Sequence, residues 1–207
     1  MGEISGNISR VTDNYTVTLS ADSDFDRKTI WRAITQEQAL STWLGRPSKS
    51  IMTGESFTLT YPNDADYSII ARVHDRRVPS SLVLSWKFNE LPENFVRITL
   101  SKRPEGGTEI RLEVTGLRRE DTAAAAATWH AQMEFLRNYL QGREVIGHAL
   151  RFRRDELIPE YEQQMLDVGA PRRSRRELLD ELEFEQSHVP PQDNEFRRVL
   201  HTHGHLA

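Results

Sequence analysis

The 207-residue sequence contains no cysteine, which excludes disulfide bonds and thiolate metal sites. It has no apolar run near the roughly 18 residues that a membrane span needs, and its first residues lack the apolar core of a signal peptide. The chain also lacks a large excess of charge of either sign, because its net charge is only −4 and neither half is strongly basic. These absences predict a cytoplasmic protein with no membrane or nucleic-acid partner.

Recognisable catalytic motifs are missing as well. The sequence has no phosphate-binding loop, no paired-carboxylate motif and no Ser/His/Asp order that would indicate a nucleophile. His74 and His130 are the histidines that could act as a general acid or base in the first 142 residues. His130 directly follows Trp129, so we expect His130 to point away from the apolar face and into solvent. We therefore predict no catalytic residue, no metal site and no cofactor.

Alternation of apolar and polar residues dominates the middle of the chain. Six segments have the period of two that is typical of strands: 15–20, 57–61, 67–75, 82–88, 96–101 and 109–114. Each has one apolar and one polar face, which predicts an antiparallel meander with one side exposed to water. On this register we expect the following side chains to face inward: Phe57, Leu59, Tyr61, Ile70, Arg72, Leu84, Trp86, Val96, Ile98, Ile110 and Leu112.

Helical periodicity flanks these strands on both sides. Residues 27–45 have apolar residues at helical spacing around a polar break, which predicts two short helices. Residues 120–142 form a long helix that ends at Gly142, and one apolar stripe runs along it: Trp129, Met133, Leu136 and Leu140. Because a sheet and a helix with apolar faces must bury them against each other, we predict an α+β fold in which the sheet curves around this helix.

Four stretches carry a resemblance to a known family. They read IWRAITQEQALSTWLG (30–45), LVLSWKF (82–88), GTEIRLEVTGL (107–117) and TWHAQMEFLRNYLQG (128–142). Their order resembles the START/SRPBCC superfamily and, within it, the branch similar to the activator homologue of the heat-shock-protein-90 ATPase. The resemblance covers roughly residues 10–142 and implies a helix-grip domain over residues 1–142 with an apolar pocket. The branch has no shared catalytic signature. The resemblance also implies possible roles known in the superfamily, including resistance to enediyne antibiotics.

The pocket is expected between the sheet and the long helix. Residues 123–127 are an unbroken alanine run, whose small side chains either leave a void opposite the sheet or let the helix pack closely on it. We predict a ligand-binding set drawn from both walls: Trp43, Phe57, Tyr61, Arg72, His74, Trp86, Ile98, Trp129 and Met133. The alternative for the tryptophans is a purely structural role in the core.

Arg72 is the charged member of this set. A buried guanidinium needs a partner, which could be a carboxylate or phenolate of the ligand. It could also be Glu55 or Asp75 of the chain itself, or Arg72 could lie exposed at the end of the sheet.

Residues 143–207 are rich in Arg and Glu and depart from the family pattern. We predict a helical extension with two helices within 150–187 and a disordered end. The first helix would carry Phe152, Leu157, Tyr161 and Met165, with Pro159 kinking or restarting it. Such apolar helices need a surface to pack on, so the extension could dock on its own domain or form a homodimer. Alternating histidines near the C-terminus, which could chelate a metal only weakly, are His201, His203 and His205.

The sequence thus favours binding of an apolar or aromatic small molecule, for example sequestration of a polyketide-like natural product. Two alternatives remain open. One is a cyclase or hydratase of the same fold, in which Arg72 or His74 polarises a carbonyl group. The other is a chaperone-associated partner protein that docks through its extension. A deep apolar pocket would favour binding, a pocket with a buried polar pair would favour an enzyme, and a closed core would favour the partner protein.

Overall fold

The computed structural model describes residues 1–61, 64–88 and 91–169. These residues form one compact unit, Met1–Gly169. The second predicted helix of the extension and the three histidines near the C-terminus lie outside the described residues.

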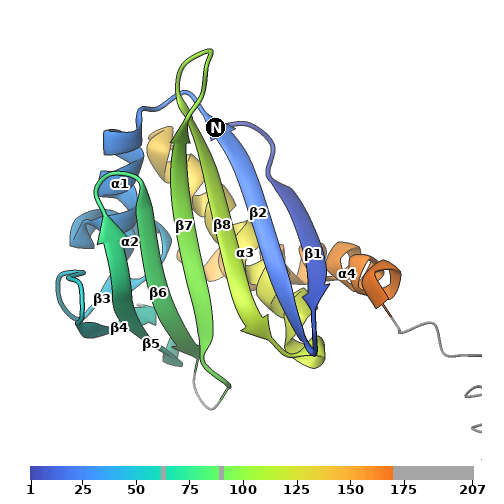
Figure 1. Ribbon diagram of the computed structural model, residues 1–207. Helices are drawn as coiled ribbons and strands as arrows, with labels where there is room; N and C mark the ends of the chain where they lie inside the picture. The colour runs from blue at the N-terminus through green and yellow to red at the C-terminus, as the bar shows by residue number, and fades with distance from the viewer. Residues whose placement is uncertain (62–63, 89–90, 170–207) are drawn as a thin grey trace, which may run out of the picture. The chain divides into compact units, whose positions relative to one another are not determined.

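Strands in this unit form one antiparallel sheet in the order β1-β2-β8-β7-β6-β5-β4-β3 (Figure 1). Their bounds are Ser5–Val11 (β1), Asn14–Ser23 (β2), Arg46–Pro47 (β3), Ser56–Tyr61 (β4), Asp64–Arg77 (β5), Ser81–Phe88 (β6), Asn94–Lys102 (β7) and Thr108–Leu117 (β8). The predicted meander is confirmed from β4 to β8. β2, which lies near the start of the chain, pairs with β8, the last strand of the meander.

β1 is an addition that the alternation did not predict. It pairs with β2 at the edge of the sheet, with Ile8 opposite Val17. Ile8 is the buried apolar residue of β1, and the buried Ile4 directly precedes the strand. A strand with so few apolar residues gives a weak periodic signal.

Two short helices follow β2. α1 (Arg27–Thr35) begins at Asp26, whose carboxylate accepts a hydrogen bond from the Thr29 backbone N–H at 2.8 Å. α2 (Glu37–Trp43) is fastened to α1 by the Trp43 indole N–H, which donates to the Ala33 carbonyl at 2.9 Å. The predicted helix pair is confirmed.

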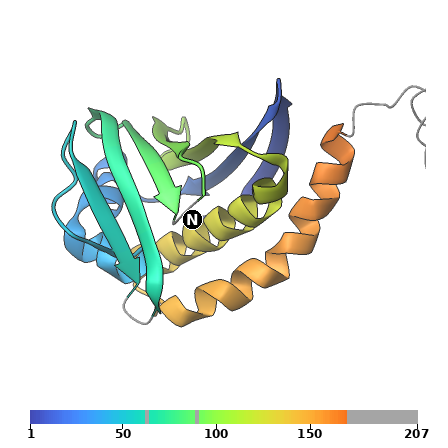
Figure 2. The same cartoon turned by 90° about the horizontal axis from the view of Figure 1, so that it is seen from below.

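α3 (Arg119–Leu140) lies along the concave side of the sheet, as Figure 2 shows. It ends before Gly142, which has a φ of +66° and so adopts the left-handed conformation that glycine favours after a helix. Trp129, Met133 and Leu136 are buried. The helix-grip arrangement of sheet and closing helix is therefore present.

α4 (Leu150–Gly169) follows a short 3₁₀ turn, Gly147–Ala149, and runs beside α3 (Figure 2). It continues through Pro159 as one helix, and it curves along its length. Leu157, Tyr161 and Met165 are buried, whereas Phe152 is 70% exposed. The predicted stripe is therefore correct for three residues and wrong for Phe152.

None of the helices in the described part of the chain combines the length and the hydropathy that a membrane crossing requires.

Candidate functional site

Aromatic and small apolar side chains fill the interface between the sheet and α3. Trp86 of β6 and Trp129 of α3 meet across it, with ring centroids 4.9 Å apart and ring planes inclined by 55°. On the sheet, Phe57 and Ala71 occupy the same cross-strand row as Trp86, because Phe57 pairs with Ala71 and Ala71 pairs with Trp86. This row gives the interior an apolar wall that faces the Trp129 indole.

Six of the nine predicted ligand-binding residues are buried: Trp43, Phe57, Trp86, Ile98, Trp129 and Met133. Trp86 and Trp129 are in direct contact, while Trp43 has its indole N–H engaged by the Ala33 carbonyl. Tyr61 lies at the end of β4, and its side chain is outside what the structure describes.

The predicted inward position of Arg72 and His74 is wrong. Both side chains are exposed, and the residues between and beside them, Ala71 and Val73, are fully buried. Arg72 pairs with Ser85, which pairs with Phe95, a residue that is 46% exposed. His74 lies 5.5 Å from the Phe95 ring.

The physical reason is the phase of β5. Ile69 and Ile70 are adjacent, so the segment offers an isoleucine to either face. The face of Ile69 continues with Ala71 and Val73 and is apolar throughout, whereas Ile70 is 52% exposed on the outer face. A one-residue change of register moves every side chain to the opposite face. The predicted register holds on the neighbouring strands, where Leu84 and Ile98 are buried.

The second half of the alanine run packs closely and lines no open space toward the sheet. Ala126 and Ala127 have no exposed surface, while Ala124 faces solvent. α3 is buried on two sides, since the sheet covers one face and α4 covers another. In this structure the interior side chains around Trp86 and Trp129 are closed to solvent.

A buried polar pair connects α3 to α4. The Nδ1 atom of His130 lies 2.8 Å from the Tyr161 hydroxyl, and the rings meet edge to face. His130 is 8% exposed and Tyr161 has no exposed surface, so the predicted solvent-facing position of His130 is wrong. Burial lowers the pKa of His130 and raises the pKa of Tyr161. Both groups are therefore neutral at neutral pH, and the direction of their hydrogen bond depends on which imidazole nitrogen carries the proton.

Glu134 extends this contact by one helical turn. Its carboxylate accepts hydrogen bonds from Nε and Nη2 of Arg153, at 2.7 and 2.9 Å. Burial alone would raise the pKa of Glu134, but the Arg153 guanidinium outweighs it and the pKa is lowered. The bidentate pair fixes the start of α4 on the middle of α3.

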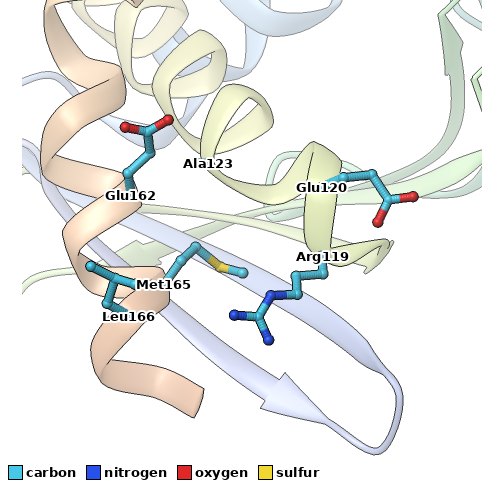
Figure 3. Close-up of a pocket in the computed structure, with 6 residues that line it drawn as sticks. All are labelled: Arg119, Glu120, Ala123, Glu162, Met165 and Leu166. Atoms are coloured by element: carbon cyan, nitrogen blue, oxygen red, sulfur yellow. The ribbon is translucent and has the colours of Figure 1, made fainter. Parts of the chain in front are cut away.

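An open hollow of about 520 Å³ lies between the start of α3 and the second half of α4 (Figure 3). Figure 3 shows Met165 reaching from α4 toward α3, while Glu120 points away from the gap. The lining residues are Arg119, Glu120, Ala123, Glu162, Met165 and Leu166. Sequence reasoning missed this second face of α3, because alanines and one histidine give no apolar stripe. The signal in the sequence is the apolar stripe of α4, Leu157, Tyr161 and Met165, which needs a surface to pack on and finds it on α3.

No group of His, Asp and Glu residues in the described ranges is arranged to hold a metal ion. The His130–Tyr161 pair is a buried hydrogen-bonded pair of titratable side chains. It lies between α3 and α4 and not between the sheet and α3.

Several solved structures share this fold. CalU16 from Micromonospora echinospora superposes with a TM-score of 0.65 at 17% identity, covering 79% of this chain and 99% of its own. EF2215 from Enterococcus faecalis gives a TM-score of 0.64 at 11% identity, with 80% and 92% covered. DynU16, a protein of the dynemicin biosynthetic locus, gives 0.56 at 22% identity, with 61% of this chain and 47% of its own covered. At these identities the likeness concerns the fold alone.

A comparison with curated proteins gives no match. Residues 24–141 match the family described as Activator of Hsp90 ATPase homolog 1-like protein. This segment runs from the residues before α1 to the end of α3 and contains the helix pair, the meander and the closing helix. The match spans more than half of the chain, which therefore belongs to the Activator of Hsp90 ATPase homolog 1-like family and has the helix-grip fold of the START/SRPBCC superfamily.

Proposed function

We propose that this protein binds an apolar or aromatic small molecule between the sheet and α3. The observation that carries the proposal is the tilted contact of Trp86 with Trp129, one indole from each wall. Aromatic pairs prefer offset or tilted arrangements, and a planar ligand offers each indole the same kind of partner. A polyketide-like aromatic compound has this chemistry.

Small residues around the pair support the proposal. Ala71 lies beside Trp86 in the sheet, and Ala126 precedes Trp129 by one turn of α3. The structural relative DynU16 is a protein of the dynemicin biosynthetic locus, and sequestration or self-resistance toward such a product is the physiological role we propose.

Entry of the ligand requires the two indoles to separate. Trp86, 9% exposed, is the more accessible of the two and marks the side from which a ligand reaches the interior. A planar ligand that stacks between the rings breaks the Trp86–Trp129 contact and makes one aromatic contact with each indole. Binding therefore moves α3 relative to β6 and changes the emission of both tryptophans.

Native mass spectrometry of freshly purified protein is the first test, because a co-purifying metabolite would identify the ligand class directly. A titration with 1-aminoanthracene, a neutral planar fluorophore, is the second. We expect Trp86→Leu to weaken its binding by about three- to tenfold, the worth of one aromatic contact.

Phe152→Leu, at an exposed aromatic residue of α4, is the matched control and should leave this affinity unchanged. Unsaturable binding, or equal affinities for Trp86→Leu and the starting protein, would contradict the proposal.

A second candidate function is docking on a protein partner, as the family description suggests. The observation that favours it is the closed packing of the interior side chains around Trp86 and Trp129. The enzyme alternative that placed Arg72 or His74 against a carbonyl group inside the pocket loses this placement, since both side chains are exposed.

The outer faces of β5 and β7 are the surface for such docking, because Ile70 and Phe95 are large apolar residues left exposed there. Paired replacement Ile70→Ser and Phe95→Ser should abolish co-purification with a heat-shock-protein-90-type chaperone and leave 1-aminoanthracene binding intact. Loss of both properties would instead indicate a folding defect, which circular dichroism would reveal.

A further inference from the structure

A second hollow lies between α1 and the turn that joins β5 to β6. Its volume is about 450 Å³, and it is lined by Lys28, Trp31, Arg32, Val78 and Pro79. Val78 is 63% exposed, so the turn presents an apolar surface to solvent. The two helix residues that carry charge are both cationic and both exposed.

Arg76, near the end of β5, contacts Trp31, which is one of the residues that line this hollow. Its guanidinium lies over the Trp31 ring, 5.5 Å from the ring centroid. This cation–π contact fixes the orientation of a long side chain. The Nε atom of Arg76 is buried and has no hydrogen-bond partner among the described groups. A guanidinium offers five N–H donors in a planar fork, so an orientated guanidinium with an unpaired Nε–H is suited to an oxyanion.

Carboxylates of the described chain leave these cations available. Lys28, Arg32 and Arg76 form no ion pair within the described ranges. Asp75, the carboxylate nearest in sequence to Arg76, pairs with Arg77 at 3.0 Å. Asp26 accepts the helix-capping hydrogen bond of Thr29, and its field reaches Arg32 without a direct pair. The local charge is therefore positive.

We propose that this hollow is a binding site for a small organic oxyanion, an apolar body that carries a carboxylate or phosphate group. The anionic group would lie in the fork of Arg76 with Lys28 and Arg32 around it. The apolar body would rest on Val78, Pro79 and the edge of Trp31. The size falls within the range of small-molecule sites in proteins, about 300–1,000 Å³. This site is independent of the interior between the sheet and α3.

An NMR titration of the full chain tests the proposal, using the indole N–H of Trp31 and the backbone amides of 28–32 and 76–78 as reporters. The probes are phenyl phosphate, benzoate and neutral phenol. We expect phenyl phosphate or benzoate to shift these signals saturably and more tightly than phenol does. The preferred anion then shows whether the site takes a phosphate or a carboxylate.

Arg76→Gln should weaken binding of the preferred anion by about tenfold or more, because it removes a charged hydrogen-bond donor. Lys28→Gln changes an exposed side chain and should weaken binding without disturbing the fold. The matched control is Arg97→Gln, since Arg97 is an exposed arginine on β7 that has no ion pair within the described ranges, and it should leave binding unchanged. Absent shifts, an equal effect of Arg97→Gln, or phenol binding as tight as phenyl phosphate would overturn the proposal.

Discussion

At the scale of single residues, Gly6 and Tyr161 illustrate how a small position in one element makes room for a large one in another. Tyr161 of α4 has no exposed surface, and its hydroxyl lies against the backbone of Gly6 in β1. A Cβ atom at Gly6 would overlap this hydroxyl. The backbone of Gly6 is not in the left-handed region, so its requirement for glycine comes from space alone.

Gly6→Ala should therefore destabilise the protein by about 1–3 kcal/mol, as overpacking does. Denaturant unfolding measures the loss. Gly2→Ala is the control, because a Cβ there would meet only an ordinary contact at 3.8 Å. In a Tyr161→Phe background the cost of Gly6→Ala should shrink without vanishing, since the hydroxyl is gone while the ring carbons at 2.8 and 2.9 Å remain. Equal costs in both backgrounds would contradict this account.

Trp129→Ala should lower the free energy of unfolding by about 3–5 kcal/mol, because it removes a large buried side chain and leaves a cavity beside Trp86. Phe152→Ala is the comparison, since that ring is 70% exposed and its removal should change stability by less than about 0.5 kcal/mol. A loss below about 1 kcal/mol for Trp129→Ala would mean that the indole contributes little to the core.

The sequence predicts residues reliably where one phase of the alternation is apolar and the other is not. Leu84 and Ile98 follow this rule and are buried as expected. β5 carries the same signal, because Ile69, Ala71 and Val73 form an apolar phase that is fully buried. The adjacent Ile70 gives the polar phase one isoleucine, and the inward prediction of Arg72 and His74 is wrong because it follows Ile70.

At the scale of elements, α3 is the helix on which both layers of packing depend. Its sheet-facing stripe was predictable, since Trp129 and Met133 recur at helical spacing. The face of α3 toward α4 could not be predicted in the same way, because it consists of alanines, His130 and Glu134 and has no apolar stripe. These residues become interior only when α4 lies beside them and supplies Tyr161 and Arg153.

The α3–α4 contact should make stability depend on pH. Burial lowers the pKa of His130 below its ordinary value of 6.5, so the folded protein disfavours the imidazolium. The contribution of the neutral form is complete above pH 6.5 and is lost as the pH falls below that value. Charged or titratable groups that act on His130 are Glu134, Arg137, Arg153, Glu160 and Tyr161.

Unfolding free energies measured at about pH 7.5 and pH 5.5 on either side of the ordinary histidine value should show this loss. His130→Gln should reduce the difference between the two pH values, whereas His74→Gln, at an exposed histidine, should leave it unchanged. The carboxylate of Glu134 does not confuse the result, because its lowered pKa places its own loss below pH 4.5. An unchanged pH dependence in His130→Gln would contradict the assignment.

At the scale of the whole molecule, α4 protects an edge of the sheet. The Gln164 side-chain amide donates to the Gly6 carbonyl at 3.2 Å, so α4 supplies a hydrogen bond to an edge strand. Unpaired edges promote association between sheets. α4, the first helix of the predicted extension, packs within the compact unit Met1–Gly169.

Truncation after Gly169 keeps α4 and is the reference for a shorter protein. Truncation after Arg143 should give a domain that is folded but less soluble, since the edge at β1 and the buried alanines of α3 become exposed. Circular dichroism and analytical ultracentrifugation of both proteins distinguish these outcomes. A fully unfolded shorter protein would contradict the first part of the expectation, and a monomeric, soluble one the second. The same comparison tests whether the extension supports a homodimer.

Contact between the first strand and the last described helix also sets an order of folding. Gly6 and Gln164 are separated by 158 positions, so their hydrogen bond closes a loop that contains nearly the whole domain. Contacts so distant in sequence form slowly, and during synthesis the N-terminal segment leaves the ribosome well before α4. The contact of β1 with α4 therefore forms late. The family segment, residues 24–141, can fold first, while the edge of the sheet at β1 is still uncovered. The nascent chain is most exposed to association during this interval, and the interval ends when α4 closes over β1.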